Sequence, residues 1–427
     1  MIVSPAWKGQ RFAVLGLARS GRATVEALLA AGAEVLAWDA KPEACEAFAG
    51  RAALADPLEA DLTGYAGVVV SPGVPLNTHP IKPHADSFGV PVIGDIELFA
   101  QAREYLPPHK VVGITGTNGK STTTALVHHI LKSAGVPTTM GGNIGLPILG
   151  QEPLPEGGVY VLELSSYQID LTSSLDCDVA VLLNVTPDHL DRYESFEAYA
   201  ASKARLFEMQ SPKQFAVVDY RAEADEDVLE SAEDPLIQFI DDIPPGDQSG
   251  WPTLQGPHNL QNAAAASAVC QHLGLTADQI ARALHTYPGL PHRMERVAEI
   301  SGVAYVNDSK GTNTAASAPA LAAFDNVHWI VGGLAKEPGL GECEAHLGHV
   351  KAAYTIGQSG EDFARLLESR VPTKRAVTLE QAIASAANSA IPGDTVLLSP
   401  ACASFDQFRD FEHRGEVFRK AVKELAA

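Results

Sequence analysis

Short apolar runs alternate with stretches of helical periodicity along the whole chain. The runs that we expect to form buried strands are residues 11–15, 67–70, 110–115, 159–162, 179–183, 303–306, 328–331 and 395–398. Because these runs are continuously apolar, both faces of each strand should be covered, as in parallel sheets flanked by helices. The pattern therefore predicts an α/β protein.

Two proline-containing breaks, at residues 105–109 and 287–292, each precede a new apolar run and are typical of linkers. They predict three domains, residues 1–108, 109–291 and 292–427. At about 150 residues per domain, a chain of 427 residues leads to the same number. The stretch 222–250 is acidic, with proline and glycine towards its end, and we expect a solvated surface excursion without chemistry.

The charge of the chain limits its partners. It has 52 acidic and 31 basic residues, a formal net charge of −21, so nucleic acid and anionic membrane surfaces should repel it. No apolar run approaches the ~20 residues of a membrane span, and no signal-peptide pattern is present. Five scattered cysteines argue against a disulfide framework or a zinc site. We expect a cytoplasmic monomer without membrane insertion.

A glycine-rich segment between the run 110–115 and an amphipathic stretch is the strongest chemical signal. In Thr-Gly-Thr-Asn-Gly-Lys-Ser-Thr (115–122), glycines let backbone N–H groups turn towards phosphate at a helix N-terminus. Lys120 would reach the terminal phosphates and Ser121 or Thr122 a Mg²⁺ ion. The strict phosphate-loop spacing is not met, because position 114 is Ile. The residues expected to contact ATP are Gly116, Thr117, Asn118, Gly119, Lys120, Ser121 and Thr122.

Polar residues follow the next predicted strands, at the edge where open α/β sheets bind ligands. Glu163 comes after the run 159–162 and offers the oxygen ligand that Mg²⁺ prefers. His189 follows the run 179–183, and Asn143 lies in a glycine-rich loop that could approach a phosphate. By itself Lys203 is interpreted as a surface lysine on a helix.

The N-terminal segment has a Rossmann-type layout. Gly16, Ala18 and Gly21 imitate G-x-G-x-x-G with its middle glycine replaced, and Asp39 ends the next strand. Alone, this layout is compatible with a nicotinamide-dependent oxidoreductase, which leaves the second glycine loop unexplained. A nucleotide-binding module without turnover is the other alternative.

The loop 115–122 resembles that of Mur ligases and folylpolyglutamate synthetases. Motifs at 162–166, 184–191, 258–262 and 290–293 follow the order of Mur ligases over essentially the whole chain, which is identified as a member of that family. The segments 307–313 and 398–408 resemble the members that add D-glutamate. The resemblance implies an ATP-dependent ligase joining D-glutamate to the alanine carboxylate of UDP-N-acetylmuramoyl-L-alanine through an acyl phosphate. The alternative is a sibling Mur-type or folylpolyglutamate-type ligase using another amino acid.

The resemblance also implies domain roles and residue roles. The three domains would be a Rossmann-like UDP-sugar domain, a central P-loop-type ATPase with a parallel sheet, and a Rossmann-like amino-acid domain. Lys120, His189 and Lys203 would be catalytic, with Lys203 carbamylated. Two Mg²⁺ ions would be held by Ser121, Glu163, His189 and Lys203. ATP would further contact Asn262, Arg293 and Asp308. The UDP-sugar would contact Arg19, Ser20, Asp39, Ser71, Pro72, Gly73, Asn143, Ser165 and His189. D-Glutamate would contact Lys310, Thr312, Ser404 and Phe405.

Two departures from the family pattern concern the C-terminal segment. The chain has Gly-Gly-Leu-Ala-Lys at 332–336, where the family often has Gly-Gly-Asp-x-Lys, so no role is assigned to Lys336. Phe405 stands where a smaller aliphatic residue is frequent.

Overall fold

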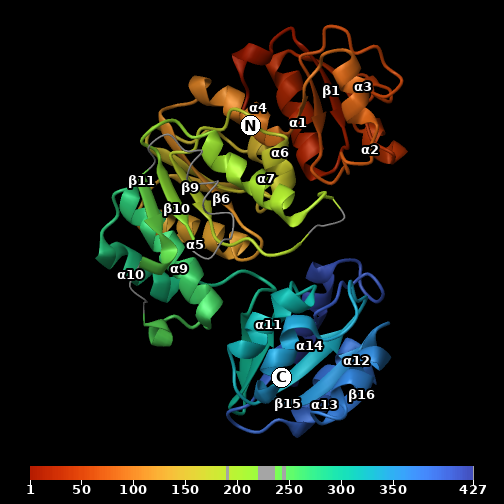
Figure 1. The fold of residues 1–427 in the computed structure, drawn as a ribbon, viewed down its shortest axis with the longest axis vertical. Coiled ribbons are helices and arrows are strands. Elements are labelled where there is room, and N and C mark those ends of the chain that lie inside the picture. Colours follow the sequence, from red (N-terminus) through yellow and green to blue (C-terminus); the bar gives the residue numbers. More distant parts are fainter. Residues whose placement is uncertain (189–191, 220–235, 243–246, 427) are drawn as a thin grey trace. The chain divides into compact units, whose positions relative to one another are not determined.

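The computed structural model describes residues 1–188, 192–219, 236–242 and 247–426. The chain divides into two compact units (Figure 1). The first comprises Met1–Pro245 and Gln261–Leu284, and the second comprises Gly246–Leu260 and His285–Ala427. The first unit holds two sheets and the second unit holds one.

The N-terminal sheet is entirely parallel, with strand order β3-β2-β1-β4-β5. Two of its inner strands, β1 and β4, are buried along most of their length, as their apolar runs predicted. The elements are β1 (Arg11–Leu15), α1 (Arg19–Ala31), β2 (Glu34–Trp38), α2 (Pro42–Glu46), β3 (Ala53–Leu54), β4 (Gly67–Val70), α3 (Ile81–Ser87), β5 (Val92–Ile93) and α4 (Asp95–Ala102).

The central sheet is also parallel, with order β11-β10-β9-β6-β8-β7. Its edge strand β11, Leu236–Phe239, pairs with β10 and is partly exposed, within the stretch that we expected to be a solvated surface excursion. The strands are β6 (His109–Thr115), β7 (Thr138–Gly142), β8 (Gly158–Glu163), β9 (Val179–Leu182), β10 (Phe215–Val218) and β11 (Leu236–Phe239). The helices are α5 (Lys120–Ser133), α6 (Ser166–Asp170), α7 (Phe196–Glu208), α9 (Pro257–His272) and α10 (Ala277–Thr286).

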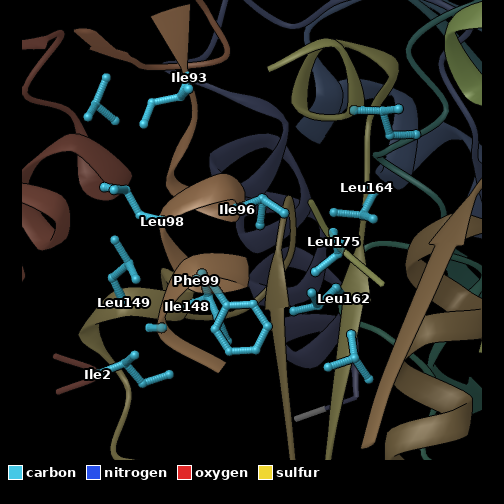
Figure 2. Close-up of a cluster of buried hydrophobic side chains, with 14 of the residues drawn as sticks. Ile2, Ile93, Ile96, Leu98, Phe99, Ile148, Leu149, Leu162, Leu164 and Leu175 are labelled. Atoms are coloured by element: carbon cyan, nitrogen blue, oxygen red, sulfur yellow. The ribbon is translucent and has the colours of Figure 1, made fainter. Parts of the chain in front are cut away.

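One continuous apolar cluster joins the two sheets of the first unit. Figure 2 shows Ile96 and Phe99 of α4 beside Ile148 and Leu162 of the central part. The amide of Ile2 donates to the carbonyl of Leu149 at 2.9 Å, so the N-terminus is tied to the same region. Burial of such apolar area is the main stabilising contribution, and it makes the two sheets one packed body.

The second unit contains a six-stranded sheet of order β12-β13-β17-β14-β15-β16. All its pairings are parallel except that of β12, an antiparallel edge strand that the apolar pattern did not reveal. Its elements are β12 (Glu295–Ile300), β13 (Val303–Asn307), α11 (Thr314–Ala322), β14 (Val327–Gly332), β15 (Val350–Ile356), α12 (Gly360–Leu367), β16 (Thr373–Val377), α13 (Leu379–Ser389), β17 (Thr395–Leu398) and α14 (Phe411–Leu425).

The predicted three-domain α/β class, with a Rossmann-like domain at each end, is confirmed. The positions of the two domain boundaries, 108 and 291, stay a prediction. Within the described part of the chain, no helix is both long enough and apolar enough to cross a membrane.

Candidate active site

The loop between β6 and α5 has the backbone of a phosphate cradle. Gly116 and Gly119 have φ of +147° and +85°, which side-chain-bearing residues rarely adopt, and a Cβ on Gly119 would overlap with Asn262 Oδ1. The amide of Asn118 donates to Asn184 Oδ1 at 2.8 Å, so the next strand-end loop supports this one. Because α5 begins at Lys120, the positive end of its helix dipole faces the loop.

Two lysines converge on the carbonyl of Gly116. Lys120 Nζ donates to this oxygen at 2.8 Å and to the Thr117 carbonyl at 2.8 Å, and Lys203 Nζ donates to Gly116 O at 3.0 Å. Lys203 is only 1% exposed, so its interpretation as a surface lysine was wrong. Burial, followed by the nearby charge of Lys120, holds the pKa of Lys203 well below its usual value. The site therefore favours an uncharged amine at position 203.

Glu163, the last residue of β8, is 2% exposed. Asn143 Nδ2 donates to its Oε1 at 3.2 Å, while its Oε2 is buried without a hydrogen-bond partner. An unpartnered buried carboxylate oxygen fits a cation ligand, because such groups otherwise carry an unfavourable desolvation free energy. Ser121 is buried at the start of α5, and His189 lies outside the described residues.

The described residues hold no cluster of three or more His, Cys, Asp or Glu side chains suited to a metal. Mg²⁺ commonly keeps waters and binds one or two carboxylates together with substrate phosphates. The Glu163 carboxylate beside a phosphate loop therefore suits Mg²⁺ held jointly by protein and nucleotide.

The N-terminal glycine loop makes hydrogen bonds with a neutral hydroxyl and with a carboxylate. Gly16 has φ of +90°, and its carbonyl accepts a hydrogen bond from Ser71 Oγ at 2.9 Å. The amide of Leu17 donates to Asp39 Oδ2 at 2.6 Å. Arg19 Nη2 donates to the carbonyl of Gly145 at 2.7 Å, within the loop that carries Asn143. Arg19 at the start of α1 therefore contacts the loop that carries Asn143, and both residues are predicted to contact the UDP-sugar.

The remaining predicted residues of this unit lie near the two glycine loops. Asn262 is buried, and its Oδ1 accepts a hydrogen bond from Thr123 Oγ1 at 3.2 Å, one turn into α5. The hydroxyl of Ser165 caps α6 by accepting from the amide of Gln168 at 3.3 Å. Ser20 is half-buried at the start of α1. Pro72 and Gly73 are half-buried and exposed, respectively, in the loop after β4.

In the second unit, the loops after β13 and β17 leave adjacent parallel strands, so they meet at one rim, as expected for the amino-acid residues. Asp308 is buried, and burial raises the pKa of its carboxyl to about 7. Ser399 Oγ donates to its Oδ2 at 2.7 Å. Arg293 is half-buried, and its charge opposes the raised pKa of Asp308.

The predicted D-glutamate residues differ in exposure. Ser404 is buried, Lys310 and Thr312 are half-buried, and Phe405 is 70% exposed. Lys310 Nζ lies 4.0 Å from the ring centroid of Phe411, an aromatic residue that the sequence interpretation did not single out. Phe411 opens α14, and no local motif marked it.

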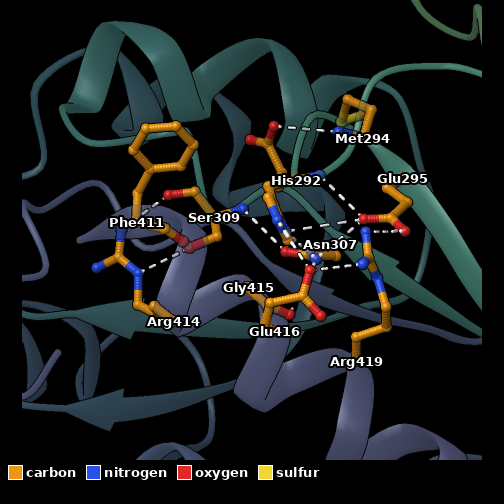
Figure 3. A network of polar contacts seen from close by, with 11 residues as sticks. His292, Met294, Glu295, Asn307, Ser309, Phe411, Arg414, Gly415, Glu416 and Arg419 are labelled. Carbon is orange, nitrogen blue, oxygen red and sulfur yellow. Dashed lines mark hydrogen bonds and ion pairs between the residues drawn. The ribbon is translucent and has the colours of Figure 1, made fainter. Parts of the chain in front are cut away.

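A buried arginine joins the two rim loops, and Figure 3 shows its contacts with Ser309. Arg414 is 1% exposed; its Nε and Nη2 donate to Ser309 Oγ and O at 2.9 and 2.8 Å, and its Nη1 donates to Cys402 O at 3.1 Å. Burial lowers the pKa of Arg414 to about 10. Ser309 precedes Lys310, so Arg414 fixes the backbone around both predicted pocket loops.

The glycine loop, the paired lysines and the strand-end carboxylate define a phosphoryl-transfer site on a three-domain α/β scaffold. Family models for the Mur ligase middle domain and for the Mur ligase glutamate ligase domain match residues 114–241 and 292–402, respectively. The chain belongs to the Mur ligase family.

Similar proteins show which members of the Mur ligase family this chain resembles. The UDP-N-acetylmuramoylalanine–D-glutamate ligase of Novosphingobium aromaticivorans is 62% identical, covering 100% of this chain and 97% of the relative. The relative of the same name from Sphingopyxis alaskensis is 59% identical, with both chains fully covered. The crystal structure of UDP-N-acetylmuramate-alanine ligase MurC from Thermotoga maritima superposes with a TM-score of 0.60 at 16% identity, covering 97% of this chain and 99% of that one. At that identity the likeness concerns the fold alone.

Proposed function

We propose that this protein joins D-glutamate to the alanine carboxylate of UDP-N-acetylmuramoyl-L-alanine, using ATP and releasing ADP and phosphate, in peptidoglycan precursor synthesis. The observation that carries the proposal is full-length similarity, at 62% and 59% identity, to two relatives named for this reaction. The phosphate loop and its two lysines supply matching geometry. The sibling ligases that use other amino acids are not favoured.

The reaction needs activation because a carboxylate is a poor electrophile. The γ-phosphoryl group of ATP passes to an oxygen of the alanine carboxylate, and ADP leaves. The neutral amine of D-glutamate then attacks the acyl carbon, and phosphate leaves as the peptide bond forms. In the proposed site, Lys120 and the loop N–H groups stabilise the charge that develops on the transferred phosphoryl group.

Mg²⁺ is part of this proposal and, when bound, supplies further positive charge at the phosphates. Ser121, Glu163, His189 and Lys203 are our candidates to hold two ions. The unpartnered Oε2 of Glu163 supports its own assignment.

Carbamylation of Lys203 is a further part of the proposal. A carbamate forms from a neutral amine and CO₂, and the lowered pKa of this buried lysine favours that neutral form. The product carries two oxygens, the ligand type that Mg²⁺ prefers.

The remaining assignments follow the family motifs and stay predictions. Asn262, Arg293 and Asp308 would bind ATP, and the loops that carry Arg19, Asp39, Ser71 and Asn143 would bind the UDP-sugar. Lys310, Thr312, Ser404 and Phe405 would bind D-glutamate, with domain boundaries at 108 and 291. A cytoplasmic monomer remains our expectation.

Phosphate release measured with UDP-N-acetylmuramoyl-L-alanine and ATP tests the function directly. We expect turnover with D-glutamate and none with L-glutamate, L-alanine or meso-diaminopimelate. Turnover with one of the other amino acids would transfer the proposal to a sibling activity. ATP binding without turnover in the presence of any of these amines would support a non-catalytic nucleotide-binding module.

The amino-acid pocket has its own test. Lys310→Ala should raise the KM for D-glutamate by about two orders of magnitude and leave ATP affinity nearly unchanged, because an unpaired substrate carboxylate loses roughly 2–5 kcal/mol. Lys374→Ala, an exposed lysine on β16, is the control. Unaltered D-glutamate kinetics in Lys310→Ala would remove the pocket from this rim.

A further inference from the structure

Arg192 connects the central sheet region with the N-terminal sheet region of the same unit. Its Nη2 donates to the carbonyl of Gly73 at 3.1 Å, and its Nη1 donates to the carbonyl of Val74 at 3.3 Å. Both carbonyls lie in the loop after β4, which also carries Ser71. One guanidinium group therefore bridges two successive carbonyls of that loop.

The same guanidinium lies over an aromatic ring. Its central carbon is 4.7 Å from the ring centroid of Tyr167, and Tyr167 stacks on Tyr193 with centroids 6.0 Å apart and planes 8° apart. A planar guanidinium can stack on a ring while its N–H groups donate in its own plane, which an ammonium group cannot do. The geometry is therefore specific for arginine.

The tyrosine platform is tied in turn to α7. Tyr193 OH donates to Asp170 Oδ2 at 2.7 Å, and Ser202 Oγ donates to Asp170 Oδ1 at 2.7 Å. Ser202 precedes Lys203 on α7. Contacts thus run without interruption from the loop after β4 to the helix that carries Lys203.

We infer that Arg192 is a positioning residue that holds the loop 71–74 in the shape required for the UDP-sugar and couples this loop to the Lys203 helix. The inference rests on the proposed assignment of Ser71, Pro72 and Gly73 to that substrate. The hydrogen bonds from Arg192 to the carbonyls of Gly73 and Val74 involve none of the residues predicted to bind ATP or D-glutamate. Substitution should therefore affect one substrate selectively.

The test compares Arg192→Ala and Arg192→Lys with the wild type. Calorimetry without ATP should show UDP-N-acetylmuramoyl-L-alanine binding weakened about tenfold or more, the scale of losing charge-assisted hydrogen bonds. The KM values for ATP and D-glutamate should stay within about twofold of the wild type, and lysine should fail to restore binding.

Arg51→Ala is the matched control. Arg51 pairs with Glu26 and lies 5.9 Å from the Phe48 ring centroid, so it combines an ion pair with an aromatic contact elsewhere in the N-terminal region. This variant should bind the UDP-sugar as the wild type does.

Coupling to the platform is tested by Tyr193→Phe, which removes the hydroxyl donated to Asp170 but keeps the ring. It should weaken UDP-sugar binding less than Arg192→Ala does. In the double variant, Tyr193→Phe should add little, because both act through one contact chain. Fully additive losses would overturn the coupling.

Wild-type affinity in Arg192→Ala, or full recovery in Arg192→Lys, would overturn the positioning role. If Arg192→Ala does not fold, Arg192→Lys and Tyr167→Leu provide the same comparison. Absence of UDP-sugar binding in the wild-type protein would instead count against the proposed function.

Discussion

The chain contains two strand–glycine loop–helix units of similar local plan, and they differ in what contacts the first glycine. The carbonyl of Gly16 accepts from the neutral hydroxyl of Ser71, and the following amide donates to the Asp39 carboxylate. The carbonyl of Gly116 instead accepts from the side-chain nitrogens of Lys120 and Lys203. Backbone shape alone therefore does not distinguish the two loops.

The difference is one of local charge. A carboxylate beside the N-terminal loop disfavours a transferring phosphate and suits the hydroxyls and amides of a nucleoside. The ammonium group of Lys120 at the central loop favours negative charge, and at short range in a partly buried site its effect is large. The comparison teaches that a glycine loop becomes a binding site or a reaction site according to the side chains that face it.

The largest effect should follow from removing the cation of the central loop. Lys120→Ala should lower kcat about 10²–10³-fold, the scale of losing one preorganised charge contact in a transition state. Stopped-time phosphate release would measure it, with unfolding followed by circular dichroism. Lys132→Ala, an exposed lysine on the same helix, should behave as the wild type. Wild-type kcat in Lys120→Ala would refute the reaction-site assignment.

The second lysine should matter almost as much, for a different reason. Lys203→Ala should lose most activity, and added short-chain carboxylates should partly restore it by replacing the proposed carbamate oxygens. Activity would be titrated against formate, acetate and propionate. A fully active Lys203→Ala enzyme, or a plain amine at Lys203 in a crystal of the active protein, would contradict the prediction.

A substitution beside the N-terminal glycine loop should weaken binding of the UDP-sugar and leave kcat nearly unchanged. Asp39→Ala removes the acceptor of the Leu17 amide and should raise the KM for the UDP-sugar about 10–100-fold, as expected for 1.5–3 kcal/mol of charged hydrogen bond. The value of kcat should stay within about threefold of the wild type. A fall in kcat comparable to that of Lys120→Ala would end the distinction between the loops.

The smallest effect concerns stability. Because the folded-state pKa of Lys203 is lowered, the unfolded chain holds the proton between that pKa and 10.5 while the native state does not. The free energy of unfolding should therefore rise with pH through this window, by at most about 1.4 kcal/mol per pH unit. Lys203→Met should lack this contribution. Urea unfolding at three pH values between 7.5 and 9.5 in CO₂-free buffer would measure the free energy of unfolding of both proteins. The same dependence of this free energy on pH in the wild type and in Lys203→Met would contradict the prediction.

Much of the fold could be predicted from the sequence because fully buried parallel strands are continuously apolar. The predicted runs 11–15, 67–70 and 395–398 coincide with β1, β4 and β17. The edge strand β12 escaped prediction because charged residues such as Glu295, Arg296 and Glu299 interrupt its apolar pattern, which an edge position tolerates. Strand β11 was missed because it is short and directly follows an acidic stretch.

Some residues of the candidate site could likewise be predicted from the sequence, and others could not. The phosphate loop was visible because its chemistry needs a particular order of glycines, lysine and hydroxyls within a few residues. The roles of Phe411 and Arg414 were not visible, because each acts on residues that are distant along the chain. His189 lies outside the described residues, so its assignment remains a prediction.

The sequence by itself determined the α/β class, the order of the strands' apolar runs and the local shape of the phosphate loop, since these depend on neighbouring residues. Only the tertiary structure decided that Lys203 is buried against Gly116, that Glu163 keeps an unpartnered oxygen, and that Arg192 reaches Gly73. Burial and charge proximity arise when distant segments pack together. They set pKa values and hydrogen-bond partners that no local pattern of residues contains.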